Sequence, residues 1–304
     1  MITVIGSLNM DLVTYTGRMP VTGETIMGKS FRQIPGGKGA NQAAAIAKLG
    51  AKVAMVGCVG RDGMGKTLMT SLQKDGVDVS NVKEVDGVAT GIAAITVDAA
   101  ANNCIIVVPG ANHCLSPEDL TAAQAVIAGS EVVVAQLEVP MDTVKAGLKI
   151  AKELNKLTIL NPAPAVPLPD EFLALVDILV PNDTELELLS GIKVTNEEEL
   201  QKAAHLLLDK GIKELIVTLG SKGCLHINGS GAKFYPAYKV YAVDTTAAGD
   251  SFIGGISTAI NEGKTLEEAI LFATAVGALT VTKEGAQSSL PYREEVEAFI
   301  QSNQ

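Results

Sequence analysis

The sequence of 304 residues predicts an α/β fold, with a doubly wound, mainly parallel β-sheet, helices on both faces and a small β-sheet lid. First, helix-like and strand-like segments alternate regularly from residue 116 onward, which indicates parallel strands joined by crossover helices. Second, strand-like segments such as residues 131–135 are largely apolar throughout, as expected of strands that helices cover on both sides. Third, residues 12–34 interrupt this alternation with strand-like segments of their own.

The core elements are predicted from apolar runs that Gly, Pro or polar residues interrupt. Residues 2–5 form a short apolar run closed by Gly6, which is typical of a buried strand. Residues 43–49 are good helix formers followed by Gly50, so they predict a helix with a glycine cap. A glycine-rich loop is expected at residues 57–65. Further strands are expected at residues 52–56, 131–136, 157–160, 177–180 and 214–218. Further helices are expected at residues 117–128, 140–154, 183–190 and 196–209, and from Phe252 onward.

The lid is predicted from two pairs of strand-like segments. Residues 12–15 and 25–31 form one pair, and residues 91–97 and 104–108 form the other, with residues 98–103 as their turn. We therefore expect one domain over residues 1–304, with a β-lid formed by about 12–34 and 91–108. An exposed apolar sheet needs covering, either by a ligand or by a second subunit.

Composition narrows the range of partners. The net charge is −10 and the sequence has no run of basic residues, which argues against nucleic-acid or anionic-membrane partners. Anionic ligands must then be held locally by amides, a metal ion or a few bases. The four cysteines are far apart and are expected to be reduced thiols in or near the core. No signal-like or membrane-spanning segment is recognised, so a cytoplasmic protein is expected.

Polar residues follow four of the predicted strands directly. In parallel sheets, ligands bind at the carboxyl ends of the strands, so this repetition predicts a continuous cleft. Glu138 is either an acceptor for sugar hydroxyls or an ordinary surface acid. Asn182 and Glu185 lie three residues apart at a helix start, where Glu185 either holds hydrated Mg²⁺ or complements the helix dipole. Residues 218–223 suit a nucleotide-binding turn, although the entry to a hairpin explains their glycines equally well.

Two N-terminal segments also carry candidate binding residues. Asn9 and Asp11 are two residues apart after the first strand, so in an extended chain they face one way and could hold vicinal hydroxyls, although an Asx turn is an alternative. Residues 36–42 are rich in glycine and include Lys38 and Asn41, with neither the Walker nor the dinucleotide pattern. We interpret them as a binding loop whose glycines let the backbone approach a ligand.

Residues 243–252 are the strongest functional candidate. Small residues lead to Gly249, which we expect to allow a tight turn, and then to Asp250 and an apolar helix. Amides at such a helix start, from Ala248, Gly249 and Asp250, suit a phosphoryl group in transfer. Asp250 could accept a proton from an attacking hydroxyl, or it could simply cap the helix.

With these motifs placed, the chain resembles the ribokinase branch of the PfkB-type carbohydrate kinases from residue 1 to about 299. The most specific matches are residues 36–43 (GGKGANQA) and 244–250 (DTTAAGD). Supporting matches are residues 7–11, 136–138, 161–164, 182–185 and 283–287. The resemblance implies a ribokinase-like fold, ATP-dependent phosphorylation of D-ribose at its 5-hydroxyl, and a homodimer formed through the lids.

The resemblance also implies roles for individual residues. Asp250 would be the catalytic base, with Ala248 and Gly249 supplying oxyanion-hole amides. The residues that would hold the sugar are Asn9, Asp11, Gly37, Lys38, Asn41, Glu138 and Asp250. Those that would serve ATP and its Mg²⁺ are Asn182, Glu185, Thr218, Gly220, Ser221, Gly223 and Gly249. A K⁺ site would use Asp244, Thr246 and Ser289, with backbone oxygens of Val281, Lys283 and Gly285.

The sequence leaves three alternative functions open. The nearest is a kinase of the same fold that acts on 2-deoxyribose, another sugar or a nucleoside. A non-catalytic sugar sensor is less favoured because Asp250 and the phosphate and cation residues are all present. An NAD-dependent dehydrogenase is disfavoured because no GxGxxG motif follows the first strand.

Overall fold

The computed structural model describes residues 1–100 and 102–303 and contains two separate sheets. The larger has nine strands in the order β13-β12-β11-β10-β9-β8-β1-β4-β5, and the strands from β5 to β11 run parallel. β12 and β13 complete it as an antiparallel hairpin. The strands are β1 (Ile2–Ile5), β4 (Val53–Gly60), β5 (Asp78–Val85), β8 (Val132–Ala135), β9 (Leu157–Leu160), β10 (Ile178–Leu179), β11 (Glu214–Thr218), β12 (Gly223–Asn228) and β13 (Gly231–Pro236).

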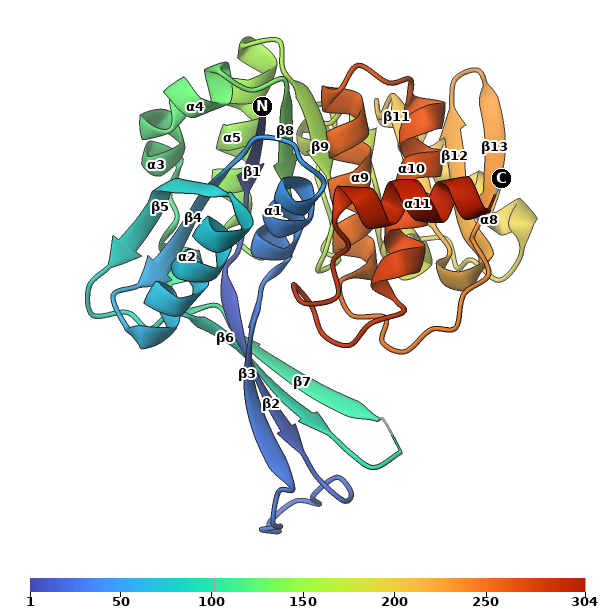
Figure 1. Ribbon diagram of the computed structural model, residues 1–304. Helices are drawn as coiled ribbons and strands as arrows, with labels where there is room; N and C mark the ends of the chain where they lie inside the picture. Colours follow the sequence, from blue (N-terminus) through green and yellow to red (C-terminus); the bar gives the residue numbers. More distant parts are fainter. Residues whose placement is uncertain (101, 304) are drawn as a thin grey trace.

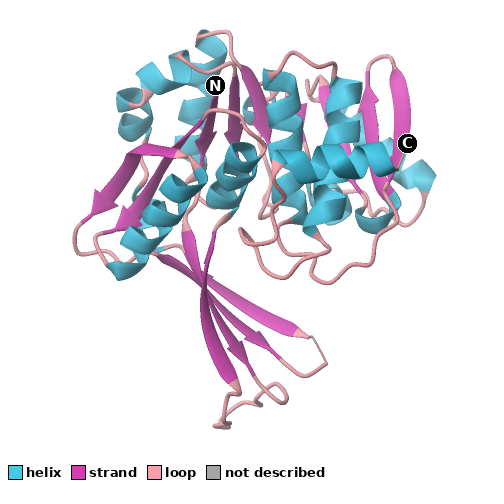
Figure 2. Ribbon diagram, viewed as in Figure 1, coloured by secondary structure: helices cyan, strands magenta, loops and turns pink. Residues whose placement is uncertain are grey.

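Helices cover both faces of this sheet (Figures 1 and 2). Ile2 and Val4 of β1 belong to one buried apolar cluster and Ile5 to the other, because successive side chains of a strand point to opposite faces. The first face is covered by α1 (Lys38–Lys48), α2 (Gly63–Asp75), α9 (Ala248–Asn261), α10 (Leu266–Thr280) and α11 (Arg293–Ser302). The second is covered by α3 (Pro117–Ala122), α4 (Gln124–Ala128), α5 (Met141–Glu153), α6 (Asp170–Leu173), α7 (Asp183–Ser190) and α8 (Glu197–Asp209). The predicted doubly wound architecture is confirmed.

The smaller sheet projects from the body of the molecule (Figure 2). Its strand order is β3-β2-β6-β7, and β2 pairs in parallel with β6. The strands are β2 (Asn9–Tyr15), β3 (Ser30–Gly36), β6 (Gly91–Val97) and β7 (Asn103–Val108). The chain enters it from β1 through only three residues, so the sheet starts beside the carboxyl edge of the main sheet. This is the lid-like sheet that the sequence predicts.

Some predicted boundaries are wrong. The strand expected at residues 25–31 begins only at Ser30, where it pairs with Tyr15 of β2. The glycine-rich segment 57–65 is not a loop, because Gly57–Gly60 complete β4 and Gly63–Gly65 begin α2. The predicted turn at residues 98–103 includes residue 101, which lies outside the described residues. Cys104 is exposed on the lid rather than near the core.

Among residues 1–100 and 102–303, no helix combines the length and the apolar character needed to cross a membrane.

Candidate active site

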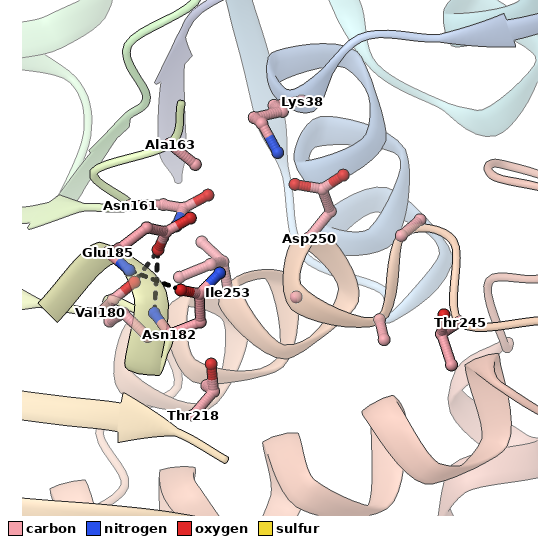
Figure 3. Close-up of a pocket in the computed structure, with 13 residues that line it drawn as sticks. Lys38, Asn161, Ala163, Val180, Asn182, Glu185, Thr218, Thr245, Asp250 and Ile253 are labelled. Carbon is pink, nitrogen blue, oxygen red and sulfur yellow. Dashed lines mark hydrogen bonds between the residues drawn. The ribbon is translucent and has the colours of Figure 1, made fainter. Parts of the chain in front are cut away.

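A cleft of about 230 Å³ opens where the carboxyl ends of β9, β10 and β11 meet the first turns of α1, α7 and α9 (Figure 3). Of the predicted site residues, Lys38, Asn182, Glu185, Thr218, Ala248, Gly249 and Asp250 line this cleft. They come from segments more than 200 positions apart, which the parallel topology brings to one edge.

Asp250 lies in the first turn of α9 and is 7% exposed. Its two carboxylate oxygens accept side-chain hydrogen bonds from α1: Oδ2 accepts from Nδ2 of Asn41 at 2.9 Å, and Oδ1 accepts from Nε2 of Gln42 at 3.0 Å. Among the described residues, no side chain accepts a capping hydrogen bond at the N-terminus of α9. The capping interpretation of Asp250 is therefore wrong. In Figure 3 its carboxylate points toward the amine of Lys38 across the cleft.

The turn before α9 differs from the predicted one. The left-handed residue is Ala247, with φ of 59°, rather than Gly249. A Cβ atom built on Gly249 would meet no atom within 4 Å, so this glycine borders open space in the cleft. The amide of Ala248 donates to the carbonyl of Thr245 at 3.2 Å. Gly249 and Asp250 belong to the first turn, where helix N–H groups have no partner within the helix.

The predicted sugar-binding residues form a connected group beside the cleft. Oε2 of Glu138 accepts from the Ser7 hydroxyl at 2.5 Å and from the backbone N–H of Lys38 at 3.1 Å. Nδ2 of Asn9 lies 3.5 Å from the same oxygen. Asn9 begins β2 and Asp11 follows on the same side of the strand, so the extended geometry predicted for this pair is confirmed.

Gly37, which precedes α1, and Gly39, the second residue of α1, are both required by the packing of the chain. Gly37 has a φ of 91°, and a Cβ atom there would lie 2.6 Å from the backbone nitrogen of Asn9. A Cβ atom on Gly39 would lie 2.6 Å from the nitrogen of Ser7. These glycines let the start of α1 approach residues 7–9, which brings Lys38 and Asn41 next to Asn9.

Buried charges define the electrostatics of the site. Burial, and then the carboxylates of Glu138 and Asp250, raise the pKa of Asp11 to about 7. Burial disfavours the charged form of Lys38, but the carboxylates of Asp250, Glu138 and Glu185 outweigh it, so the pKa of Lys38 lies above its ordinary value. Burial also raises the pKa of Glu185. Lys38 is therefore the cation that balances this group of acids.

Asn182 and Glu185 form a capping box at the start of α7. Oδ1 of Asn182 accepts from the backbone N–H of Glu185 at 2.7 Å, and Oε2 of Glu185 accepts from the N–H of Asn182 at 2.9 Å. Glu185 is 9% exposed and lines the cleft, as Figure 3 shows. Glu185 therefore occupies the helix-start position that the sequence left open as an alternative, and it also faces the cleft.

Gly220, Ser221 and Gly223 lie just beyond the cleft, whereas Thr218 lines it. Gly220 and Ser221 belong to a 3₁₀ turn, η2 (Gly220–Lys222), that joins β11 to β12, and Gly223 is the first residue of β12. A Cβ atom on Gly223 would lie 2.0 Å from the carbonyl oxygen of Tyr235, so the hairpin itself requires this glycine.

Four of the residues predicted for a cation, Asp244, Thr246, Val281 and Gly285, are joined by hydrogen bonds near the start of α9. Asp244 accepts hydrogen bonds from the Thr246 backbone and hydroxyl through Oδ1, at 2.9 and 2.7 Å, and from the Gly285 backbone through Oδ2 at 2.9 Å. Burial opposes its charge, but these bonds outweigh it and lower the pKa of Asp244. The Val281 carbonyl already accepts from the N–H groups of Val243 and Asp244. Ser289 is buried and donates to the carbonyl of Ala286 at 2.8 Å.

Several residues around the site were not predicted. Asn112, in the 3₁₀ turn η1 (Gly110–Cys114), donates from Nδ2 to Oδ1 of Asn9 at 2.7 Å and accepts from the Leu8 backbone. Gln42 and Gln136 are fully buried behind Asp250. Gln42 lies within the glycine-rich motif of residues 36–43, but nothing in that pattern indicates its contact with Asp250. Among the described residues, no group of three or more His, Cys, Asp or Glu side chains is arranged to hold a metal ion.

Comparison with known proteins gives consistent matches over the whole chain. Residues 1–293 match the pfkB family of carbohydrate kinases. A ribokinase of Haemophilus influenzae is 43% identical over 300 residues, covering 99% of this chain and 98% of that protein. A deoxyribokinase of Salmonella typhi is 39% identical, covering 100% of this chain and 99% of that protein.

The solved structures agree with the sequence matches. A ribokinase of Arabidopsis thaliana complexed with ribose and ATP superposes with a TM-score of 0.92 at 34% identity, covering 99% of this chain and 98% of that chain. The fold, the cleft at its sheet edge and these matches lead to one conclusion: the chain belongs to the pfkB family of carbohydrate kinases.

Proposed function

We propose that this protein transfers the γ-phosphoryl group of ATP to the 5-hydroxyl of D-ribose, giving ribose 5-phosphate. The observation that supports this most is the position of Asp250. Its carboxylate lies in the first turn of α9, between the group around Glu138 and the wall that contains Glu185 and Thr218. A hydroxyl bound on one side and a phosphate bound on the other would meet beside it.

In this mechanism Asp250 orients the 5-hydroxyl toward the γ-phosphate and accepts its proton as the new P–O bond forms and the bond to ADP breaks. Phosphoryl transfer has a loose transition state, so a weak base is sufficient and positioning dominates. The N–H groups of the first turn, led by Gly249, would stabilise negative charge on the transferred group. The Ala248 amide could join them only by releasing the Thr245 carbonyl.

The opposite wall of the cleft suits the nucleotide and its metal. Carboxylate and amide oxygens of Glu185 and Asn182 fit a Mg²⁺ ion that keeps most of its water shell, and bound Mg²⁺ would neutralise phosphate charge. We assign Thr218, Gly220, Ser221 and Gly223 to the nucleotide because they continue this wall beyond β11. Lys38 would attract the phosphates and balance the carboxylates around it.

On the sugar side, Asn9, Asp11, Asn41 and Glu138 offer amide and carboxylate groups to hydroxyls, with Gly37 keeping the loop close. The experiment that tests the assignment compares kcat/KM for ribose and 2-deoxyribose in the presence of ATP, Mg²⁺ and K⁺. A site built for the 2-hydroxyl would reject 2-deoxyribose strongly, because buried polar groups would be left unpaired. The resemblance to a deoxyribokinase makes 2-deoxyribose the second candidate, and a preference for it would move the assignment there.

Sugar affinity is expected to depend on pH through Asp11. Hydroxyls that donate to its carboxylate favour the charged form, so binding lowers its pKa from about 7 and releases a proton. Affinity should therefore rise with pH below about 7 and level off above it. Calorimetric titrations with ribose across this range measure the slope, and Asp11→Asn should flatten it. If the affinity of Asp11→Asn for ribose still rises with pH, a group other than Asp11 is responsible.

Activity is also expected to depend on K⁺. We propose a K⁺ site at Asp244, Thr246 and Ser289 with backbone oxygens of Lys283 and Gly285. Val281 is a weaker ligand than the sequence suggested, since its carbonyl already accepts two hydrogen bonds. The loop of Asp244 leads directly into α9, so the ion would order Gly249 and Asp250. Replacing K⁺ by Na⁺ should lower kcat, and equal rates in both salts would remove this site.

The lid is expected to pair with a second copy. The side chains of Phe31, Ile105, Ile106, Val107 and Val108 on the small sheet are all between 48 and 68% exposed, and such a surface needs a cover. Ile105 and Ile106 point to opposite faces of β7, so one of Ile105→Lys and Ile106→Lys should convert dimers to monomers in sedimentation experiments, with Asn103→Lys as the control. If both isoleucine variants remained dimeric, the result would contradict the proposal.

We also propose a cytoplasmic location, because the reaction draws on the cellular pool of ATP.

A further inference from the structure

A chain of buried amides runs from the end of β8 to Asp250. Nε2 of Gln136, the residue that follows β8, donates to Oε1 of Gln42 at 2.6 Å. Nε2 of Gln42, in α1, donates to Oδ1 of Asp250 at 3.0 Å. Both glutamines are 0% exposed, and neither lines the cleft. Gln42 therefore contacts the proposed base from the side of the protein interior, and Gln136 contacts Gln42.

The direction of every amide in this chain is determined by groups that can only accept. The carbonyl of Val180 accepts from Nδ2 of Asn161 at 3.1 Å, so Oδ1 of Asn161 faces Gln42 at 3.3 Å. Oδ1 of Asn161 and the Asp250 carboxylate both require a donor from Gln42, which places its Nε2 there. Its Oε1 must then face Gln136, which supplies the matching Nε2. Reversing any one amide would set donor against donor or acceptor against acceptor.

Holding Gln136 in this orientation lowers the stability of the fold. Its Oε1 is buried and has no hydrogen-bond partner among the described residues. A buried unsatisfied acceptor lowers the stability of the fold, and an apolar side chain would avoid this loss. A Cβ atom on Gly6, the residue that follows β1, would lie 2.1 Å from this oxygen. The glycine therefore leaves space for the amide of Gln136. An amide therefore occupies a place where packing alone would favour a hydrocarbon.

We propose that Gln42 and Gln136 are positioning residues for the reaction: Gln136 fixes the amide of Gln42, which holds the carboxylate of Asp250 in the plane needed by the sugar hydroxyl. A terminal carboxylate has a broad torsional preference, so an Asp held at one oxygen can still turn. Asn41 holds Oδ2 and Gln42 holds Oδ1, and together they stop that rotation. The inference rests on the proposed function, because it concerns the same base.

The experiment is a double-mutant cycle with Gln42→Met, Gln136→Met and the double variant, measured as kcat and KM for ribose. Each single variant should lower kcat about tenfold or more, since small misplacements of a reacting group are costly. KM for ribose should stay near that of the unmodified protein, because neither side chain lines the cleft. In the Gln42→Met background, Gln136→Met should have little further effect on kcat, since its influence passes through Gln42.

The control is Ser130→Ala, which removes a buried hydroxyl that lies 2.7 Å from that of Thr3, near the opposite end of β8. It should lower the melting temperature and leave kcat unchanged. If the unmodified protein shows no ribose-dependent turnover, the proposed function itself fails.

If the unmodified protein is active, single variants with normal kcat would overturn the positioning role. Additive losses in the cycle would also overturn it. If Gln136→Met does not fold, Gln42→Met alone decides, because a normal kcat in that variant is incompatible with the proposal.

Discussion

Replacing Asp250 by Asn is expected to lower kcat with ribose by a factor of about 10² or more while the fold remains intact. The side chain keeps its shape but loses its charge and one acceptor oxygen. Asn41 and Gln42 both donate to Asp250, so the new NH₂ group would face one of these donors directly. The variant therefore loses both the base and its alignment. Steady-state turnover together with circular dichroism measures the two effects separately.

The matched control for this change is Asp142→Asn, which also removes an acid from the first turn of a helix, α5. Asp142 is exposed and does not line the cleft, so kcat should not change. Turnover by Asp250→Asn close to that of the unmodified protein would refute the assigned role, even with the control behaving as expected.

Gly37→Ala and Gly249→Ala are both expected to impair function, but with opposite effects on the melting temperature. At Gly37 the φ of 91° is strained for alanine by about 1–2 kcal/mol, and the new Cβ atom would meet the backbone nitrogen of Asn9 at 2.6 Å. Gly37→Ala should lower the melting temperature by several degrees and weaken ribose binding, since the start of α1 must move away from Asn9.

At Gly249 the added methyl group meets no protein atom within 4 Å, and alanine is favoured over glycine in a helix. Gly249→Ala should therefore keep or raise the melting temperature. It should still lower kcat, because the methyl group enters the space proposed for the transferred phosphoryl group. Thermal unfolding and turnover of the two variants test this contrast, which would fail if Gly249→Ala were fully active.

Much of the fold could be predicted from the sequence because local patterns determine it. Apolar runs and their glycine or proline boundaries indicated β1, β9, α7 and β11 correctly. The parallel topology then placed the residues after the strands on one edge, which is why Asn182, Glu185 and Thr218 were expected in one cleft.

The errors concern contacts between distant segments. The sequence did not indicate that Gly37, before α1, makes way for the backbone of Asn9, because residue type alone cannot reveal this packing relation. The left-handed turn before α9 falls on Ala247, because the surrounding structure overrides the preference for glycine. Asn112 follows the lid strands and reaches Asn9 only in the folded protein. The role of Gln42 was missed, although it lies within the GGKGANQA motif, because its contact with Asp250 joins residues 208 positions apart.

The most direct test of the central claim is the product formed from ribose and ATP in the presence of Mg²⁺ and K⁺. Phosphorus NMR of the reaction mixture distinguishes a phosphate on the 5-hydroxyl from other esters and from free phosphate. We expect ADP and ribose 5-phosphate in equal amounts, at a rate that Asp250→Asn reduces by about 10² or more. ATP that remains unconsumed while the protein binds ribose would contradict it and favour a sugar sensor.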